Sequence, residues 1–179
     1  MSNVKWQMSK LILVLGVFLW AAFPVLALPP KKQPTPLPTP TPAKVDYFLV
    51  YPGILPDHFL YPIKMVRDRI WLFLTADPLR KAETLLLFAD KRLGAGKALI
   101  EGGKEQLGIS TLTKAEKYLE RAIAQERIAS QKGKDTTAFL EKLLLATKKH
   151  EEVLLELGRS DLLHYPRQGY EEVRRRLGK

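Results

Sequence analysis

Hydrophobic residues recur three and four positions apart through most of the chain after residue 60. This spacing places them on one face of an α-helix, and it is interrupted by proline, glycine and capping residues where helices start and stop. Four such segments follow one another, and a short basic segment comes after them. The pattern predicts helices over residues 62–75, 78–101, 109–131 and 135–157, with a short C-terminal helix over 169–177.

The boundaries of these helices carry recognisable signals. In Asp77-Pro78 the aspartate can accept a hydrogen bond from an otherwise unpaired backbone N–H, and proline fits the first helical position. For the third helix, Ser110, Thr111 or Thr113 can serve as the cap, and Thr113 with Glu116 fits a capping box. These signals predict turns between successive helices rather than one long helix.

Each predicted helix has an apolar stripe that we expect to face a common core. The stripes suit an all-α, antiparallel bundle of about four helices plus the short C-terminal helix. Residues 44–62 are rich in aromatics and proline, and we expect them to cross the bundle as an irregular strap. The stripes consist of Ile63, Val66, Ile70 and Phe73; Leu79, Ala82, Leu86, Ala89, Leu93 and Ile100; Leu112, Ala115, Leu119, Ala122 or Ile123, and Ala129; and Phe139, Leu143, Ala146, His150, Val153 and Leu157.

Residues 1–27 have the order of an export signal. Two lysines and no acidic residue precede the apolar run Leu11–Ala27, and Val25 and Ala27 fit the small-residue positions of a cleavage site. The segment is predicted to be a signal peptide or, if it is not cleaved, a signal anchor in the membrane. In both cases the rest of the chain is expected outside the cytoplasm, either secreted or anchored to the cell membrane.

Residues 28–43 are dominated by proline and threonine. Proline lacks a backbone N–H and restrains its neighbours to extended geometry, so this stretch predicts a stiff linker that rises about 3.1 Å per residue. The linker would hold residues 44–179, the helical bundle domain, away from a membrane surface.

Charge and cysteine content narrow the expected partners. The formal net charge is +10, and it is +8 without residues 1–27, which carry only two lysines. This excess favours an unknown protein or an anionic envelope partner, with membrane contact through the N-terminal segment if it is uncleaved. No nucleic-acid recognition motif is present, and the absence of cysteine excludes disulfides and thiolate metal sites.

Few residues suggest chemistry. His150 lies on the apolar stripe of the fourth predicted helix, where a metal ligand or a proton switch competes with a hydrogen-bonded core histidine. We favour the core histidine, because no second ligand lies three or four residues away and His58 and His164 fall in loops. The pair Glu151-Glu152 is expected on the solvated surface. The sequence therefore predicts no catalytic, cofactor-binding or metal-binding residue, and no enzyme.

Two lysines that follow glycine, in Gly96-Lys97 and Gly103-Lys104, lack the earlier glycine that a phosphate-binding loop requires. The densest positive cluster is C-terminal and is the one candidate binding site, for anionic lipid or polymer. The alternative is that these arginines lie on a solvated face and bind no ligand. The cluster consists of Arg159, Arg167, Arg174, Arg175 and Arg176.

Several motifs together resemble a known family. They are Gly53-Ile54-Leu55-Pro56-Asp57, Tyr61-Pro62, the helix start at Asp77-Pro78 and the segment Phe88-Ala89-Asp90-Lys91-Arg92-Leu93. The stretch that contains them resembles bacterial extracytoplasmic helical domains of unknown function. The resemblance implies an exported helical domain and supplies no catalytic residues.

The function expected from these features is that of an uncharacterised exported or membrane-tethered helical domain. We expect a non-enzymatic binding or structural module at the cell envelope. The alternative is an extracytoplasmic sensor or regulatory domain of an envelope signalling system.

Overall fold

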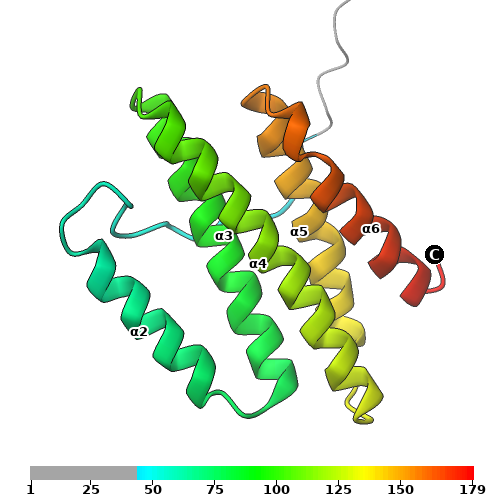
Figure 1. Cartoon of the computed structure of the whole chain (residues 1–179). Helices are drawn as coiled ribbons and strands as arrows, with labels where there is room; N and C mark the ends of the chain where they lie inside the picture. The colour runs from blue at the N-terminus through cyan, green and yellow to red at the C-terminus, as the bar shows by residue number, and fades with distance from the viewer. Residues whose placement is uncertain (1–43) are drawn as a thin grey trace, which may run out of the picture. The chain divides into compact units, whose positions relative to one another are not determined.

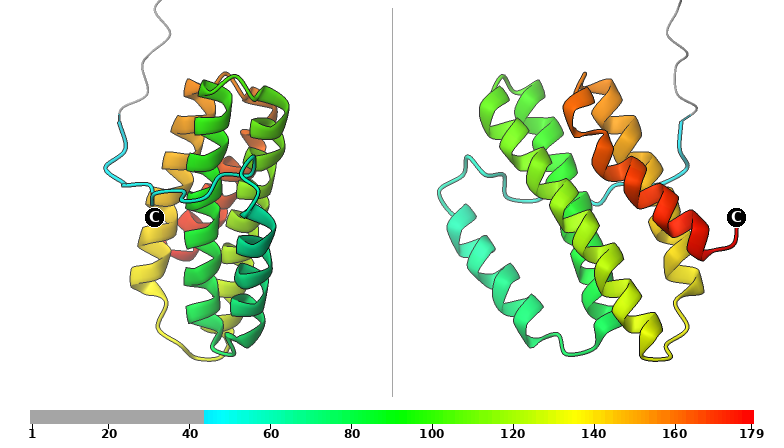
Figure 2. Two further views of the ribbon diagram at one scale, coloured as in Figure 1. Left: turned by 90° about the vertical axis from the view of Figure 1, so that its left-hand side faces the viewer. Right: turned by 45° about the vertical axis from the view of Figure 1, so that its right-hand side comes forward.

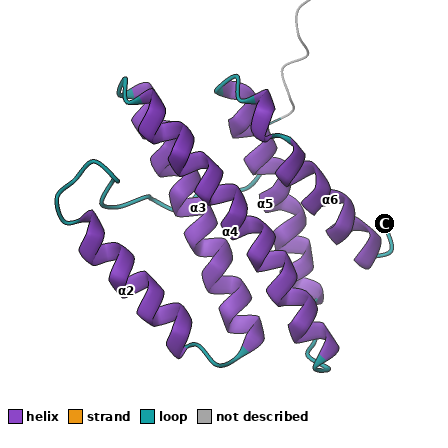
Figure 3. Cartoon of the chain, in the orientation of Figure 1, coloured by secondary structure: helices purple, strands orange, loops and turns teal. Residues whose placement is uncertain are grey.

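The computed structural model describes residues 44–179, and the predicted signal segment and linker lie outside the described residues. Within the described part, five α-helices and one 3-10 turn are present and no strand (Figures 1 and 3). The all-α prediction is therefore confirmed. The elements are α2 (Tyr61–Leu74), α3 (Pro78–Glu101), α4 (Glu105–Gln131), α5 (Thr137–Glu156), η2 (Ser160–Leu162) and α6 (His164–Arg176).

The helices α3 and α4 form the closest pair, as the views in Figure 2 show. Two glycines make this contact possible. A Cβ on Gly96 would lie 2.6 Å from Leu112 Cδ2, and a Cβ on Gly108 would lie 2.5 Å from Ile100 Cγ1. Larger residues at these positions would push the helices apart. Gly96 therefore allows the close packing of α3 and α4. The sequence had predicted no phosphate-binding loop at Gly96-Lys97.

The start of α3 is as predicted, and the start of α4 is not. Asp77 Oδ1 accepts a hydrogen bond of 2.9 Å from the Arg80 backbone N–H. The helix α4 begins at Glu105, four residues before the predicted Ile109. Thr113 lies inside α4, where its hydroxyl donates to the Ile109 carbonyl over 3.0 Å. The capping-box prediction was wrong because Gly103, at φ +77°, already turns the chain and lets the next helix begin at once.

The C-terminal helix α6 also starts earlier than predicted, at His164 rather than Gly169. Gly169 is buried, and a Cβ added there would lie 2.8 Å from Ile123 Cδ1. Val173, one turn later, is fully buried. The helix is thus packed against α4 and α5 along its length.

The core is formed chiefly by α3, α4 and α5, with contributions from α6. One hydrophobic cluster lies toward the N-terminal half of α3, and a second lies toward its C-terminal half. The predicted stripes of α3, α4 and α5 supply most of the buried side chains. The large side chains that are fully buried or nearly so include Leu86, Leu93, Leu112, Leu119, Leu143, Val153 and Leu154.

The apolar stripe predicted for the first helix does not face this core. Ile63, Val66, Ile70 and Phe73 are all at least half exposed on α2. The side of α2 that meets the bundle instead carries Leu72 and Asp68, the buried residues of this helix. The predicted orientation of the helix was therefore wrong, although its boundaries differ from those observed by only one residue.

Residues 44–60 form the predicted strap, and its residues are at most partly buried. The Tyr47 hydroxyl donates to Asp90 Oδ2 over 2.7 Å, and the Val45 N–H donates to Glu152 Oε2 over 2.7 Å. Phe48 and Tyr51, in contrast, are 89% and 81% exposed. Over residues 44–50 exposed and partly buried side chains alternate, as they do along an extended chain, so only one set meets the helices.

Candidate functional site

A buried polar cluster among the described residues is centred on His150. Its Nδ1 lies 2.9 Å from Glu116 Oε1, and its Nε2 lies 3.3 Å from Asp90 Oδ1. Asp90 also accepts the Tyr47 hydroxyl. The cluster therefore joins α3, α4, α5 and the strap through hydrogen bonds in the centre of the domain.

The two carboxylates control the protonation of His150. Burial alone disfavours the charged ring, but the charge of Glu116 and the hydrogen bonds to Asp90 and Glu116 outweigh it and raise the pKa of His150 to about 9. At neutral pH the ring is thus an imidazolium that donates from both nitrogens. Burial and the charge of Asp90 likewise raise the pKa of Tyr47.

This geometry is that of a structural cluster. Both ring nitrogens of His150 already bond to carboxylates, and neither His150 nor Glu116 has an exposed side chain. No group of three or more potential metal ligands gathers within residues 44–179. His58 stacks on Phe59 in the strap, whereas His164, which was also predicted in a loop, is the first residue of α6 and lies tilted beside Tyr165; both histidines lie near the surface. The hydrogen-bonded core histidine favoured from the sequence is confirmed.

Sequence reasoning missed the partners of His150. It also placed both members of the Glu151-Glu152 pair on the solvated surface, and for Glu152 this was wrong. Glu152 is buried, where it accepts from Lys149 Nζ over 2.6 Å as well as from the strap. Burial opposes its charged form, yet these two hydrogen bonds hold the pKa of Glu152 below its usual range. A usable signal existed: Asp90 and Glu116 directly follow the stripe residues Ala89 and Ala115.

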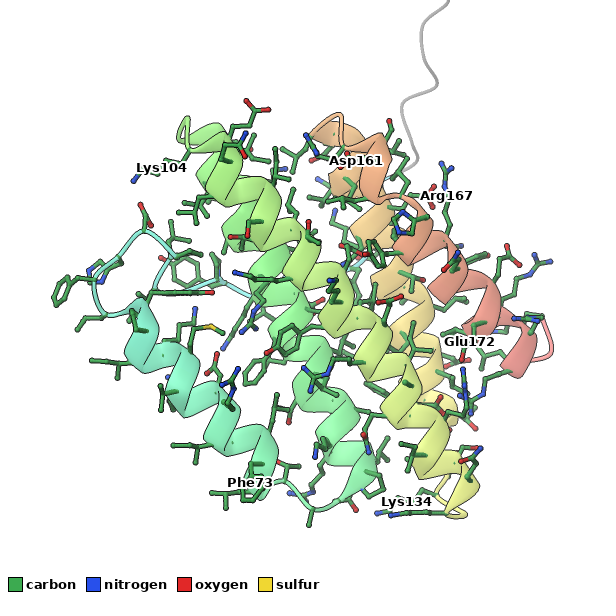
Figure 4. All side chains as sticks on the ribbon, in the orientation of Figure 1. Phe73, Lys104, Lys134, Asp161, Arg167 and Glu172 are labelled. Atoms are coloured by element: carbon green, nitrogen blue, oxygen red, sulfur yellow. The ribbon has the colours of Figure 1, made fainter. Side chains whose placement is uncertain are left out.

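The predicted arginine cluster lies around η2 and α6, and Figure 4 labels Arg167 there. Most of its charge is paired within the domain. Carboxylate partners lie 2.7 Å from Arg159, 2.7 Å from Arg167 and 3.8 Å from Arg174. Arg176 bonds to the buried carboxylate of Glu126, and Arg175 donates to a backbone carbonyl over 3.3 Å. Anion binding at this cluster stays a prediction, and any anion there would compete with these carboxylates.

The most unusual surface is the outer face of α2, which we define as Ile63, Val66, Ile70, Trp71, Phe73 and Leu74. These side chains are between 52% and 84% exposed. Other exposed leucines and isoleucines of α3, α4 and α5 are scattered singly and are only 36% to 42% exposed. A continuous patch of large apolar side chains marks a contact surface far more often than scattered ones do.

Basic side chains accompany this face. Arg67 pairs with Asp68 over 2.8 Å, and Asp68 itself is buried beneath the helix. Arg69 is exposed on the other flank and has no carboxylate partner among the described residues. The outer face of α2 is thus apolar with cationic edges and no exposed acid on the same helix.

Comparison with known proteins identifies a family but no activity. A family model described as Domain of unknown function (DUF5667) matches residues 53–160, a segment that includes α2, α3, α4 and α5. No curated protein and no solved structure matches the chain. Within residues 44–179, no helix combines the length and apolar character needed to cross a bilayer. More than half of the chain fits the family model, so the protein belongs to the DUF5667 family of unknown function.

Proposed function

We propose that residues 44–179 form a non-enzymatic binding or structural module of the cell envelope, with the outer face of α2 as its contact surface. One observation carries the proposal: this helix exposes all of its large apolar stripe, while the helices behind it bury theirs. Leaving so much apolar surface in water is unfavourable by about 25 cal/mol per Å². A partner that covers the face would recover this free energy.

The interior polar groups support a role without catalysis. Tyr47, Asp90, Glu116 and His150 bond to one another in a buried cluster. A general acid or base must come within hydrogen-bond reach of a substrate. The positions of His150 and Glu116, with no exposed side-chain area, do not offer that access.

Placement at the envelope rests on the sequence of residues 1–43, with its export signal and proline-rich linker. The sensor alternative rests on the same segment and stays a prediction. The binding-module proposal goes further because a particular surface, the outer face of α2, supports it.

Cysteine labelling tests the proposal directly, because the natural chain has no cysteine. Ile70→Cys places a thiol on the outer face of α2. Leu145→Cys places a matched control on α5, at a leucine that is 42% exposed. A membrane-impermeant maleimide is applied to the purified full-length chain and to intact cells that produce it.

In purified protein both thiols should react at similar rates. In intact cells Leu145→Cys should still react, which would place the domain outside the cytoplasm, while Ile70→Cys should react at least about tenfold more slowly because a partner covers it. Equal rates at the two positions in cells would contradict the use of α2 as a contact surface. No labelling of either thiol in intact cells would contradict the envelope placement.

A further inference from the structure

We infer that the partner of the outer face of α2 is the surface of an anionic lipid bilayer, on which α2 lies parallel to the membrane plane. This inference rests on the proposed function and names the partner. Three features of the described residues carry it: the direction of the apolar stripe, the positions of the cations around it, and the poor fit of the face to a second copy of the chain.

The apolar stripe of α2 points directly away from the bundle. Successive residues of an α-helix turn by about 100° around its axis. On this basis the mean direction of the stripe lies about 160° from the mean direction of the inward residues. The stripe residues used here are Ile63, Val66, Ile70, Phe73 and Leu74, and the inward residues are Met65, Asp68 and Leu72. The ribbon of α2 runs along one edge of the molecule in Figure 1, and the labelled Phe73 lies near its C-terminal end in Figure 4. A flat surface can therefore reach the whole stripe from the side of α2 that faces away from the bundle.

Cations border the stripe on both sides. Arg67 and Arg69 lie about 20° and 40° beyond its two edges on the same helical wheel. Trp71 lies beside Arg67, next to a hollow of about 330 Å³ that it lines with Ile70 and Leu74. An apolar stripe with flanking cations and an edge tryptophan is the arrangement of helices that lie in the headgroup region of a membrane.

More positive charge lies where α2 meets the bundle. A groove of about 250 Å³ contains Arg69 from α2, Lys81 from α3 and Arg121 from α4, with Tyr118 and Phe73 in its wall. Within residues 44–179 none of these three cations forms an ion pair with a carboxylate, although Arg121 lies 5.1 Å from the Tyr118 ring centre. A phosphate headgroup beside the inserted stripe would meet three cations from three helices.

A second copy of the chain fits this face poorly. In a two-fold symmetric dimer each patch meets the same patch of its partner. The stripe residues would then pair well, but Arg67 and Arg69 of both copies would gather at one interface. The one acid of α2, Asp68, is buried and already pairs with Arg67 of its own chain, so no acid of the helix offsets the approach of Arg69 to its copy. An anionic bilayer offers the same apolar burial with charges of opposite sign.

The predicted N-terminal segment favours a membrane as the nearby surface. If residues 1–27 act as the predicted signal anchor rather than a cleaved signal peptide, the sixteen residues of the linker, 28–43, would keep the domain within about 50 Å of the membrane at about 3.1 Å per residue. A weak docking surface suffices at such a high local concentration.

Trp71 supplies a site-specific test in the full-length chain. The other two tryptophans, Trp6 and Trp20, are replaced by phenylalanine, and the protein is reconstituted into vesicles of phosphatidylcholine alone or with phosphatidylglycerol. Brominated lipids in either vesicle quench a tryptophan that enters the acyl region, and aqueous iodide quenches one that remains in water. Since the N-terminal segment is the same in both vesicles, a difference between them reports α2.

We expect bromine quenching of Trp71 in the phosphatidylglycerol vesicles and iodide quenching in the neutral ones. Ile70→Glu with Phe73→Glu should abolish the bromine quenching, while Leu145→Glu on α5 should retain it. Arg69→Gln and Arg121→Gln should each lower the docked-to-undocked ratio about fivefold, the effect of one cation near an anionic lipid surface. The matched control is Lys142→Gln, an exposed lysine of α5 that should have no effect.

Two results would overturn the inference. One is full access of iodide to Trp71 in both kinds of vesicle, and the other is protection of Trp71 that depends on protein concentration without lipid, which would indicate a second copy. Either result would leave the proposed function standing if Ile70→Cys were still protected in cells, since the partner would then be a protein. Equal labelling in cells together with no bromine quenching would reject both.

Discussion

The helices α3 and α2 are adjacent in the chain, and both carry apolar side chains at helical spacing, yet they place them in opposite environments. The stripe of α3 is buried from Ala82 to Leu99, whereas the stripe of α2 points to solvent. The difference lies in the rest of each helix. Apolar residues of α3 spread over a wide sector that two neighbours can cover, while the inward side of α2 holds only a few residues, among them the charged Asp68. Periodicity shows that a helix is amphipathic and leaves open which medium its apolar side meets.

The two regions also differ in how they are held. The bundle combines hydrophobic clusters with the buried bonds of His150, Glu116 and Asp90. Under α2, Arg92 stacks 4.1 Å from the Tyr118 ring centre and donates to the sulfur of Met65 over 3.3 Å. The bundle therefore carries the stability of the domain, and α2 is an attached surface element. The following changes test this comparison, from the largest expected effect to the smallest.

Leu143→Ala should have the largest effect. Leu143 is fully buried in α5, and removal of its side chain should lower the free energy of unfolding by about 2–5 kcal/mol. Leu145→Ala, two residues away at a leucine that is 42% exposed, should change it by less than about 1 kcal/mol. Urea denaturation monitored by circular dichroism measures both. Similar losses at the two positions would contradict the assignment of the buried face.

The His150 cluster should make stability depend on pH in the alkaline range. The pKa of His150 is about 9 in the fold and near 6.5 in the unfolded chain. Protonation therefore stabilises the fold fully below pH 6.5, and this contribution disappears as pH rises through about 9. The free energy of unfolding should fall by up to about 3 kcal/mol across this window, as judged from urea curves at each pH.

His150→Gln removes the titrating group, so its curve should lack the fall that the unaltered protein shows. Should that variant not fold, Glu116→Gln serves instead. Loss of the anionic partner should lower the pKa of His150 and narrow the pH range over which the free energy of unfolding falls. Parallel pH profiles for all three proteins would rule out a charged His150 in the core.

Gly96→Ala tests the close contact of α3 and α4. The added methyl would lie 2.6 Å from Leu112 Cδ2, so the helices must shift, at a cost of about 1–3 kcal/mol in unfolding free energy. Gly94→Ala is the matched control in the same helix. Its Cβ would lie 3.7 Å from Pro52, an ordinary contact, and alanine should stabilise this position by up to about 1 kcal/mol. Thermal unfolding should show a lower Tm for Gly96→Ala and a Tm that is unchanged or higher for Gly94→Ala. Equal shifts in Tm would contradict the close contact of α3 and α4.

Asp77→Ala should give a smaller loss, about 0.5–2 kcal/mol, because Asp77 caps the first turn of α3 at the junction with α2. Glu83→Ala, at an exposed position on α3, should stay within about 0.5 kcal/mol. Urea denaturation again provides the comparison. No difference between the two variants would mean that the cap contributes nothing to the junction.

Much of this fold could be predicted from local signals. Asp77-Pro78 marked the start of α3 correctly, and the stripes of α3, α4 and α5 named most of the buried residues. These features depend on neighbours in the sequence, through capping and helical spacing. The start of α4 was placed too late because hydroxyl residues inside the helix resembled its caps, and the start of α6 was also placed too late.

The rest depended on contacts between distant residues. Asp90 and Glu116 lie 60 and 34 positions from His150, so no local spacing could indicate that their side chains meet. The arginine cluster was predicted from charge density, but two of its carboxylate partners, Glu151 for Arg167 and Glu126 for Arg176, come from other helices. The orientation of α2 likewise depends on its contacts with the bundle, which come from residues distant in the sequence.

The outward orientation of α2 is the central claim, and one stability measurement tests it most directly. Ile70→Glu introduces a charge at the middle of the stripe with a residue that favours helix, and urea denaturation gives the change in free energy of unfolding. The account predicts a change of less than about 1 kcal/mol, as for an exposed position. A loss of about 3 kcal/mol or more, as expected for a charge forced into a core, would show that α2 packs its stripe inward.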